Sequence, residues 1–203
     1  MIYLYGASGH GKVVAEIAEQ NGHLIGGFID ANPAITKLLN YSVSTQLPDD
    51  SYSGNGFIIS IGNNGIRKKV AQELSGNRFE TLIHHRSSIS QRASVDDGTV
   101  VMAGVSINVD VTIGKHCIIN TNASVDHDCK IADFVHISPN VALAGDVWVG
   151  EGTHIGIGAS AIQGVQIGKW CTIGAGAVII RDVPDGATVV GNPGRIIKTL
   201  DPK

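Results

Sequence analysis

The sequence predicts a small Rossmann-like α/β domain over residues 1–83, followed by a left-handed parallel β-helix over residues 84–203. Three observations predict this architecture. Aliphatic residues recur every six positions through the second part, while glycine-rich loops link apolar strands to amphipathic helices in the first. In addition, 26 of the 203 residues are glycine, well above the usual share of about 7 %. Glycine suits chains that turn sharply and often.

The hexad pattern begins at Ile83 and continues to Ile179 without a phase break. Seventeen consecutive positions at this spacing hold sixteen aliphatic residues and Ala161. A small residue lies four positions after most of them, and Gly, Asn or Asp often follows directly, as expected where φ becomes positive. A period of six fits a short strand plus a corner, so that three hexads close a triangular coil and coils stack at ~4.8 Å. We expect about five coils from roughly Ile89 to Pro184.

All three cysteines fall in the small position of the hexad. Cys117, Cys129 and Cys171 occupy places where Ala and Val stand in other repeats. We therefore interpret them as small buried residues rather than as nucleophiles or metal ligands. An odd number of cysteines also does not form a disulfide framework.

The first eighty residues contain two strand–loop–helix units. The predicted strands cover residues 2–5, 24–29, 57–61 and 79–83, and the predicted helices cover residues 12–20 and the segment with Ile66, Val70 and Leu74. Strands that alternate with helices in this way favour a parallel sheet. The domain is smaller than a complete dinucleotide-binding fold.

The loop Gly6-Ala7-Ser8-Gly9-His10-Gly11 joins the first strand to the first helix. Backbone N–H groups in such a loop, together with the helix N-terminus, can approach a phosphate. Asp30 ends the second strand, where related folds hold a ribose hydroxyl. The G-x-x-G-x-G spacing and the small domain favour one nucleotide carrying another group, such as a sugar, with Ser8 and His10 beside it.

Four histidines lie within the repeat. His127 stands at a corner between Asp126 and Asp128, and a carboxylate beside an imidazole is the usual arrangement for a general base. His136 and His154 are 18 residues apart, so we expect them to point outward from one face, one above the other. A rival interpretation makes this pair two ligands of a zinc ion, completed by a histidine of a neighbouring subunit. His116 is expected at another corner.

Three-sided prisms with flat faces tend to pack as trimers, which creates clefts between subunits. A corner histidine that faces the flat wall of a neighbour would form a narrow slot suited to a long, thin cofactor.

The charge balance limits the possible partners. The chain has 15 Lys and Arg against 18 Asp and Glu, a net charge of −3, without a basic run. This composition disfavours nucleic-acid and membrane binding. The N-terminus lacks the features of a signal peptide, and no apolar run approaches the ~20 residues of a membrane span, so we expect a cytoplasmic protein.

Four segments together carry a resemblance to a known family. They are Tyr5–Gly11, Ser60–Asn64 with the following Ile66–Lys69, Ala123–Cys129 and Val190–Arg195. The combination, which extends over essentially the whole chain, resembles the PglD/NeuD family of sugar acetyltransferases. It looks most similar to the UDP-amino-sugar N-acetyltransferases that make bacillosamine-type diacetamido sugars.

The resemblance implies a role for eleven residues. Ser8, Gly9, His10, Asp30 and Gly62 would bind the UDP-sugar, His127 would be the catalytic base supported by Asp128, and His136, Gly145, Ile157 and Ala175 would contact acetyl-CoA. The sequence departs from the family at three positions: Asp128 replaces Glu, Ala175 replaces Gly and Gly194 replaces Ala.

The resemblance also implies a reaction and an assembly. A sugar 4-amino group would attack acetyl-CoA directly in a ternary complex, without a metal or an acyl-enzyme, in a homotrimer with active sites between subunits. Two other functions stay open at this point. One is O-acetylation of sialic acid or another sugar hydroxyl, and the other is a binding or scaffold trimer without turnover.

Overall fold

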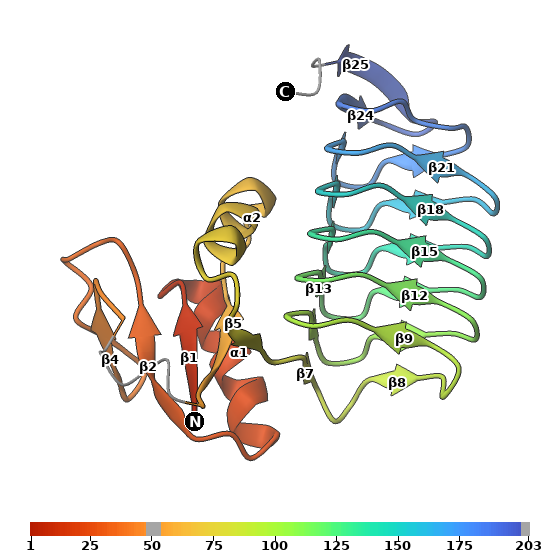
Figure 1. The fold of residues 1–203 in the computed structure, drawn as a ribbon. Helices are drawn as coiled ribbons and strands as arrows, with labels where there is room; N and C mark the ends of the chain where they lie inside the picture. The colour runs from red at the N-terminus through yellow and green to blue at the C-terminus, as the bar shows by residue number, and fades with distance from the viewer. Residues whose placement is uncertain (48–53, 200–203) are drawn as a thin grey trace.

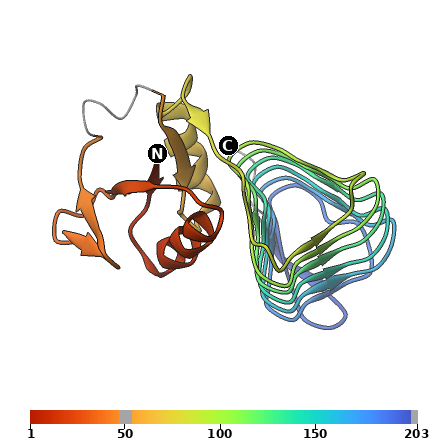
Figure 2. The same ribbon diagram turned by 90° about the horizontal axis from the view of Figure 1, so that it is seen from below.

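The computed structural model describes residues 1–47 and 54–199. Figure 1 shows an α/β domain beside the lower coils of a left-handed parallel β-helix, and Figure 2 shows the triangular cross-section of that β-helix. Both parts of the predicted fold class are confirmed. Within the described ranges, neither helix has the length and apolarity needed to cross a membrane.

The α/β domain is a sheet with one helix on each face. Its strand order is β3-β4-β2-β1-β5-β6, parallel except for the β3–β4 pair. The elements are β1 (Ile2–Tyr5), α1 (Gly9–Gln20), β2 (Ile25–Ile29), β3 (Lys37–Leu38), β4 (Tyr41–Ser44), β5 (Gly56–Ile59), α2 (Asn64–Glu73) and β6 (Arg78–Phe79). Because side chains alternate along β1, Ile2 and Leu4 pack with α1, whereas Tyr3 packs with α2.

Two predictions for this domain need correction. The first helix begins at Gly9 rather than at Lys12, directly after the extended residue Ser8. The single strand predicted over residues 79–83 is wrong, because β6 pairs with β5 whereas β7 (Leu82–Ile83) pairs with β10 in the β-helix. The chain thus passes from one part to the other within three residues. The β3–β4 hairpin was not predicted, since its short strands show no clear alternation.

The β-helix contains seventeen two-residue strands, β7 to β23. They are β7 (Leu82–Ile83), β8 (Ser88–Ile89), β9 (Ser94–Val95), β10 (Val100–Val101), β11 (Ser106–Ile107), β12 (Thr112–Ile113), β13 (Ile118–Ile119), β14 (Ser124–Val125), β15 (Lys130–Ile131), β16 (His136–Ile137), β17 (Ala142–Leu143), β18 (Trp148–Val149), β19 (His154–Ile155), β20 (Ser160–Ala161), β21 (Gln166–Ile167), β22 (Thr172–Ile173) and β23 (Val178–Ile179). The first coil begins one strand before the predicted start at Ile89, so the β-helix is longer than the five coils expected.

Three parallel sheets form the three faces. We call the sheet that contains β7, β10, β13, β16, β19 and β22 face 1, the sheet from β8 to β23 face 2, and the sheet from β9 to β21 face 3. Strands 18 residues apart pair in register, for example β14 with β17. Equivalent corner residues of successive coils therefore lie one above another.

The interior follows the hexad prediction. The aliphatic residue of nearly every strand is buried in one continuous core, together with the small residues between strands. Cys117, Cys129 and Cys171 are at most 1 % exposed, which confirms their inward position. Burial raises the pKa of the Cys117 thiol to about 12.

The left-handed backbone positions differ from the prediction. Positive φ occurs three residues after the aliphatic residue, as at Asp110, Asp128 and Asn140, and not directly after it. The residue that follows the aliphatic one is small for another reason: a Cβ on Gly150 would lie 2.6 Å from the backbone of Gly168 in the next coil. Close stacking of coils thus selects glycine there.

Two features close the β-helix. The lower coils of face 1 are covered by α1, where Val100 and Ile118 share a core with Val14 and Ile17. At the upper end, β24 (Ala187–Val190) extends face 1 by pairing with β22, and β25 (Arg195–Thr199) returns antiparallel beside it.

Candidate active site

The corner between faces 2 and 3 carries His127, in the turn after β14. Its imidazole Nδ1 lies 2.7 Å from Asp128 Oδ2, and the two side chains are 54 % and 58 % exposed. Because an ionised carboxylate only accepts hydrogen bonds, Nδ1 carries the proton and Nε2 of the neutral ring is free to accept one. Asp128 reaches this position from a left-handed backbone with φ 63°.

Asp126 shapes the same turn. Its Oδ1 accepts hydrogen bonds from the backbone N–H of His127 at 2.8 Å and from Asn108 Nδ2 at 2.6 Å. These bonds lower the pKa of the Asp126 carboxyl. The hydrogen bond that the imidazole donates to Asp128, followed by the charge of Asp126, raises the pKa of His127. The corner therefore holds a basic imidazole in one orientation.

Gly145 lies one coil above His127 on this corner. A Cβ on Gly145 would come within 2.5 Å of His127 Nε2, so only glycine leaves room for the ring. In the described part of the chain, the backbone N–H of Gly145 makes no hydrogen bond. A shallow groove of about 350 Å³ runs beside this corner over face 2, where Ser124, Ala142 and Ser160 form its floor.

Ile157 and Ala175 lie on a different corner, between faces 1 and 2. They are one coil apart, both exposed, and the N–H of Gly176 donates to the carbonyl of Ile157 at 2.8 Å. Face 2 separates them from His127. A single chain therefore brings Gly145 to the predicted base, but not Ile157 or Ala175.

His136 lies on face 1 beneath the α/β domain. Its ring stacks on His154 with centroids 4.8 Å apart, as the spacing predicted, and its Nε2 lies 3.3 Å from Asn120 Nδ2. Burial, with further contributions from His154, Arg67 and His10, lowers the pKa of His136 to about 3. Its predicted contact with acetyl-CoA stays a prediction, since the structure places it on another face from His127.

A second cavity, of about 500 Å³, opens at the carboxyl ends of β1 and β2. Ser8 and Asp30 line it together with Lys69 and Glu73 of α2. Asp30 accepts hydrogen bonds from the N–H of Ala7 at 2.7 Å and of Asn32 at 2.9 Å, so its carboxylate holds the glycine loop in place. We call this space the nucleotide cavity, after the ligand predicted for this loop.

The other three residues predicted for the nucleotide-sugar lie around this cavity rather than in its lining. Gly9 has open space where a Cβ would stand. His10 is turned toward the domain interface, where its Nε2 is buried without a hydrogen-bond partner among the described residues. Burial, followed by the charge of Arg67, lowers the pKa of His10 to about 4. Gly62 lines an adjacent hollow next to His154.

Arg67 is the most buried charged residue of the domain interface, and the sequence interpretation missed it. It is 1 % exposed, and its guanidinium donates to the carbonyls of His116 at 2.7 Å, Phe134 at 2.8 Å and Ile61 at 2.9 Å. A further bond reaches Asn64 Oδ1 at 2.9 Å. The available signal was helical spacing, because Arg67 precedes Val70 and Leu74 on the apolar side of α2.

No group of three or more His, Cys, Asp or Glu side chains is placed to hold a metal ion anywhere in residues 1–47 and 54–199. The stacked pair His136 and His154 shares its ring faces, and Nε2 of His154 lies 2.9 Å from Ser138 Oγ. Nε2 of each ring thus has a polar partner within the same chain, Asn120 for His136 and Ser138 for His154.

Comparisons with known proteins agree with this layout. The model of the PglD N-terminal domain matches residues 1–74, and that of the bacterial transferase hexapeptide (six repeats) matches residues 146–181. A curated relative, UDP-N-acetylbacillosamine N-acetyltransferase of Bacillus subtilis (strain 168), is 43 % identical over 49 residues. That stretch covers 23 % of this chain and 23 % of the relative's length.

Several solved structures match almost the whole chain. A variant of the GDP-perosamine N-acetyl transferase of Caulobacter crescentus, in complex with CoA and GDP-perosamine, has a TM-score of 0.91 and 35 % identity, covering 97 % of this chain and 96 % of that one. The acetyltransferase domain of PglB from Neisseria gonorrhoeae FA1090 has a TM-score of 0.90 and 36 % identity, covering 97 % and 98 %. The chain belongs to the PglD/NeuD-type family of acetyl-CoA-dependent sugar N-acetyltransferases.

Proposed function

We propose that this chain transfers the acetyl group of acetyl-CoA to the 4-amino group of a nucleotide-linked 4-amino-4,6-dideoxy sugar, with His127 as general base. The observation that carries this proposal is the His127 corner, where Asp128 holds Nδ1 at 2.7 Å and Nε2 stays free to accept a proton beside Gly145. An exposed, carboxylate-oriented imidazole is suited to accept a proton from a reacting amine.

The reaction proceeds by direct attack. The amine nitrogen bonds to the thioester carbonyl carbon, and His127 Nε2 takes a proton from that nitrogen. The free N–H of Gly145 donates to the oxyanion, in the manner of an oxyanion hole. Collapse of the tetrahedral intermediate breaks the C–S bond, and the imidazolium returns the proton to the CoA thiolate. The buried cysteines take no part, because none of them reaches solvent.

The nucleotide cavity supports a nucleotide-linked acceptor over a free sugar. A glycine loop at the N-terminus of α1, with Asp30 at the end of β2, forms its wall, and such loops bind phosphate groups. We propose UDP as the carrier, from the resemblance to the bacillosamine enzymes. One relative was crystallised with a GDP-linked sugar, so the test also compares the two carrier nucleotides, UDP and GDP.

The two separate corners support a homotrimer. His127 and Gly145 lie on one corner and Ile157 and Ala175 on another, with face 2 between them. One acetyl-CoA touches both groups when the second corner comes from a neighbouring subunit. Light scattering is expected to give three times the chain mass at micromolar concentration, and a monomer would contradict an intersubunit site. The cytoplasm stays the predicted compartment.

A panel of acceptors tests the function. Release of CoA thiol from acetyl-CoA is followed with a thiol reagent, offering UDP-4-amino-4,6-dideoxy-N-acetylhexosamine, GDP-perosamine and free sialic acid in parallel. We expect rapid release with the UDP-amino-sugar and little with the others. Release with GDP-perosamine alone would contradict UDP as the carrier nucleotide and favour GDP. Release with sialic acid alone would contradict N-acetylation and favour the O-acetyltransferase alternative.

A further inference from the structure

Among the described residues that line the groove over face 2, only Asp126 is charged. Asp126 directly follows β14. Because side chains alternate along a strand, it points outward from face 2 as Ser124 does, whereas Val125 points into the core. The next residue is the proposed base, His127. An acceptor atom that lies in the groove beside His127 therefore lies beside this carboxylate as well.

The two oxygens of Asp126 differ in what they bond. Oδ1 accepts from the N–H of His127 at 2.8 Å and from Asn108 Nδ2, one coil below, at 2.6 Å. Within residues 1–47 and 54–199, Oδ2 has no hydrogen-bond partner, and no Lys or Arg forms an ion pair with this carboxylate. Because Asn108 holds the carboxylate by Oδ1, Oδ2 is available to an N–H donor beside the base.

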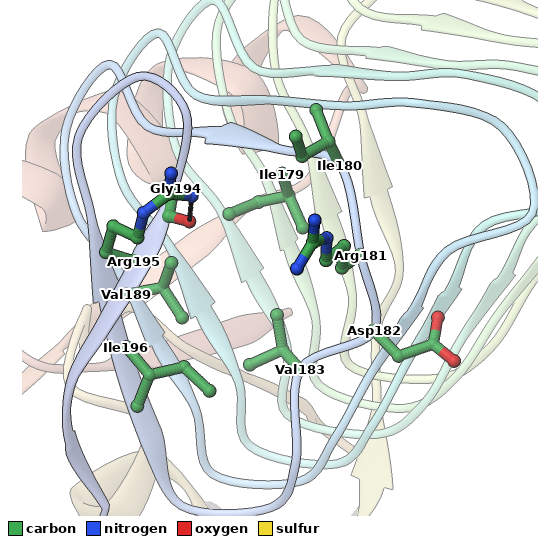
Figure 3. A pocket seen from close by; sticks show the side chains of 9 residues that line it. All are labelled: Ile179, Ile180, Arg181, Asp182, Val183, Val189, Gly194, Arg195 and Ile196. Carbon is green, nitrogen blue, oxygen red and sulfur yellow. Dashed lines mark hydrogen bonds between the residues drawn. The ribbon is translucent and has the colours of Figure 1, made fainter.

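The nearest cation above His127 in its own column of corner residues is distant. Positions 127, 145, 163 and 181 are separated by 18 residues each and stack along the corner. The first cation in this column is Arg181, which stands on the rim of the cavity under the β24–β25 hairpin (Figure 3). Three coils at ~4.8 Å give a rise of ~14 Å, beyond the Debye length of ~8 Å. Asp126 therefore stays a strong hydrogen-bond acceptor.

The residues one coil higher complete a site for a tetrahedral centre. Ala144 and Gly145 stack on Asp126 and His127 at the coil spacing of ~4.8 Å, and Ala144 lines the same groove. In the proposed reaction the oxyanion lies at the N–H of Gly145. The attacking nitrogen, bonded to the same carbon, then lies over the coil below, between His127 and Asp126.

We propose that Asp126 selects amines over hydroxyl groups as acceptors, and that Asn108 positions it for this contact. A primary amine has two N–H bonds. One donates to Nε2 of His127 and the other to Oδ2 of Asp126, which leaves the lone pair for the thioester carbon. A hydroxyl group has one hydrogen, so once it donates to His127 it turns an oxygen lone pair toward the carboxylate. This inference rests on the proposed function, since it explains the choice of acceptor at that same site.

Two acceptors that differ only at position 4 test the proposal. UDP-4-amino-4,6-dideoxy-N-acetylhexosamine and its 4-hydroxy counterpart are each offered with acetyl-CoA to wild type, Asp126→Asn and Asn108→Ala. Acetylated product is quantified by mass spectrometry, so that slow turnover of the hydroxyl is measured. In Asp126→Asn the amide keeps the shape and can still accept through Oδ1, but it presents an N–H donor in place of Oδ2. We expect its kcat/KM to fall at least about tenfold for the amine, and not to fall for the hydroxyl.

The variant Asn108→Ala keeps the carboxylate but removes the bond that positions it. The preference for the amine should therefore fall by a smaller factor, roughly threefold. Asp110→Asn is the matched control, because it removes the same charge from an exposed residue of a lower coil that does not line the groove. It should leave the preference unchanged. A ratio of two acceptors does not depend on the fraction of folded enzyme, so a purely structural role would not alter it.

The outcomes separate this inference from the proposed function. An unchanged ratio in Asp126→Asn, or equal losses for both acceptors, would overturn the inference and leave N-acetyl transfer in place. Product with neither acceptor in the wild type would overturn the proposed function and the inference together.

Discussion

Histidines occupy two contrasting regions of the β-helix. At the corner between faces 2 and 3, His127 is 54 % exposed, and Asp128 raises its pKa. On face 1, beneath the α/β domain, His136 is largely covered, and burial lowers its pKa to about 3. Both belong to the same hexad repeat. Their cover and nearest charges, rather than their place in the repeat, decide which of them can exchange protons with a substrate near neutral pH.

The largest expected effect is a loss of activity on substitution of His127, at the exposed corner between faces 2 and 3. His127→Ala removes the proposed proton acceptor, so kcat should fall by about 10²–10⁴-fold, the usual contribution of a general base. Steady-state thiol release measures it, with both KM values expected to stay within a few-fold. His85→Ala, at an exposed histidine far down the β-helix, is the control. A kcat near that of wild type in His127→Ala would remove His127 from the mechanism.

Substitutions in the covered region, where the α/β domain packs on face 1, are expected to lower the free energy of unfolding. Arg67→Met leaves the carbonyls of His116 and Phe134 without their buried donor, at a cost of roughly 3 kcal/mol. For a chain of this size that corresponds to a loss of roughly 6–12 °C in Tm. Thermal unfolding followed by circular dichroism measures this loss.

Lys68→Met is the matched control. Lys68 is next to Arg67 and forms an ion pair with Glu151, but its side chain is 33 % exposed. Its loss should cost about 1 kcal/mol or less. Equal Tm values for the two variants would contradict the role of Arg67 in holding the domains together.

A smaller effect concerns the stability of the fold at acidic pH. His10 and His136 have pKa values lowered to about 4 and about 3 by burial, whereas unfolded histidines titrate near 6.5. Between these values the unfolded chain binds more protons, so stability falls as pH drops below about 6.5, by up to ~1.4 kcal/mol per pH unit for each such histidine.

Urea unfolding at several pH values measures this slope. His136→Gln removes one titrating group and should make the slope shallower. His127 acts in the opposite direction, since its pKa is raised. An unchanged slope in His136→Gln would mean that His136 is not covered in solution.

The difference between the two regions also explains what the sequence could predict. The hexad fixes which side chains point inward, so the buried cysteines, the stacking of His136 on His154 and the corner position of His127 follow from spacing alone. The cover over face 1 does not, because it depends on how α1 and α2 pack against the β-helix. For this reason the sequence did not predict the burial of His136 or the hydrogen bonds from Arg67 to buried carbonyl groups.

A local feature set a second limit. The left-handed corner residue falls three positions after the aliphatic one, and polar residues at both places make the two indistinguishable in sequence. Periodicity predicts direction well, but it does not predict which groups from non-adjacent segments meet.

The pH dependence of kcat/KM in wild type and in Asp128→Asn tests the central claim most directly. In the proposed mechanism His127 acts as an unprotonated base, so the rate should rise with pH through a pKa above 6.5, since Asp128 raises it. In Asp128→Asn that pKa falls, so the acidic limb should move to lower pH and the plateau should drop, because the ring loses its fixed orientation. A limb contributed by the substrate amine stays in place in both proteins. Acidic limbs at the same pH in both would contradict the account.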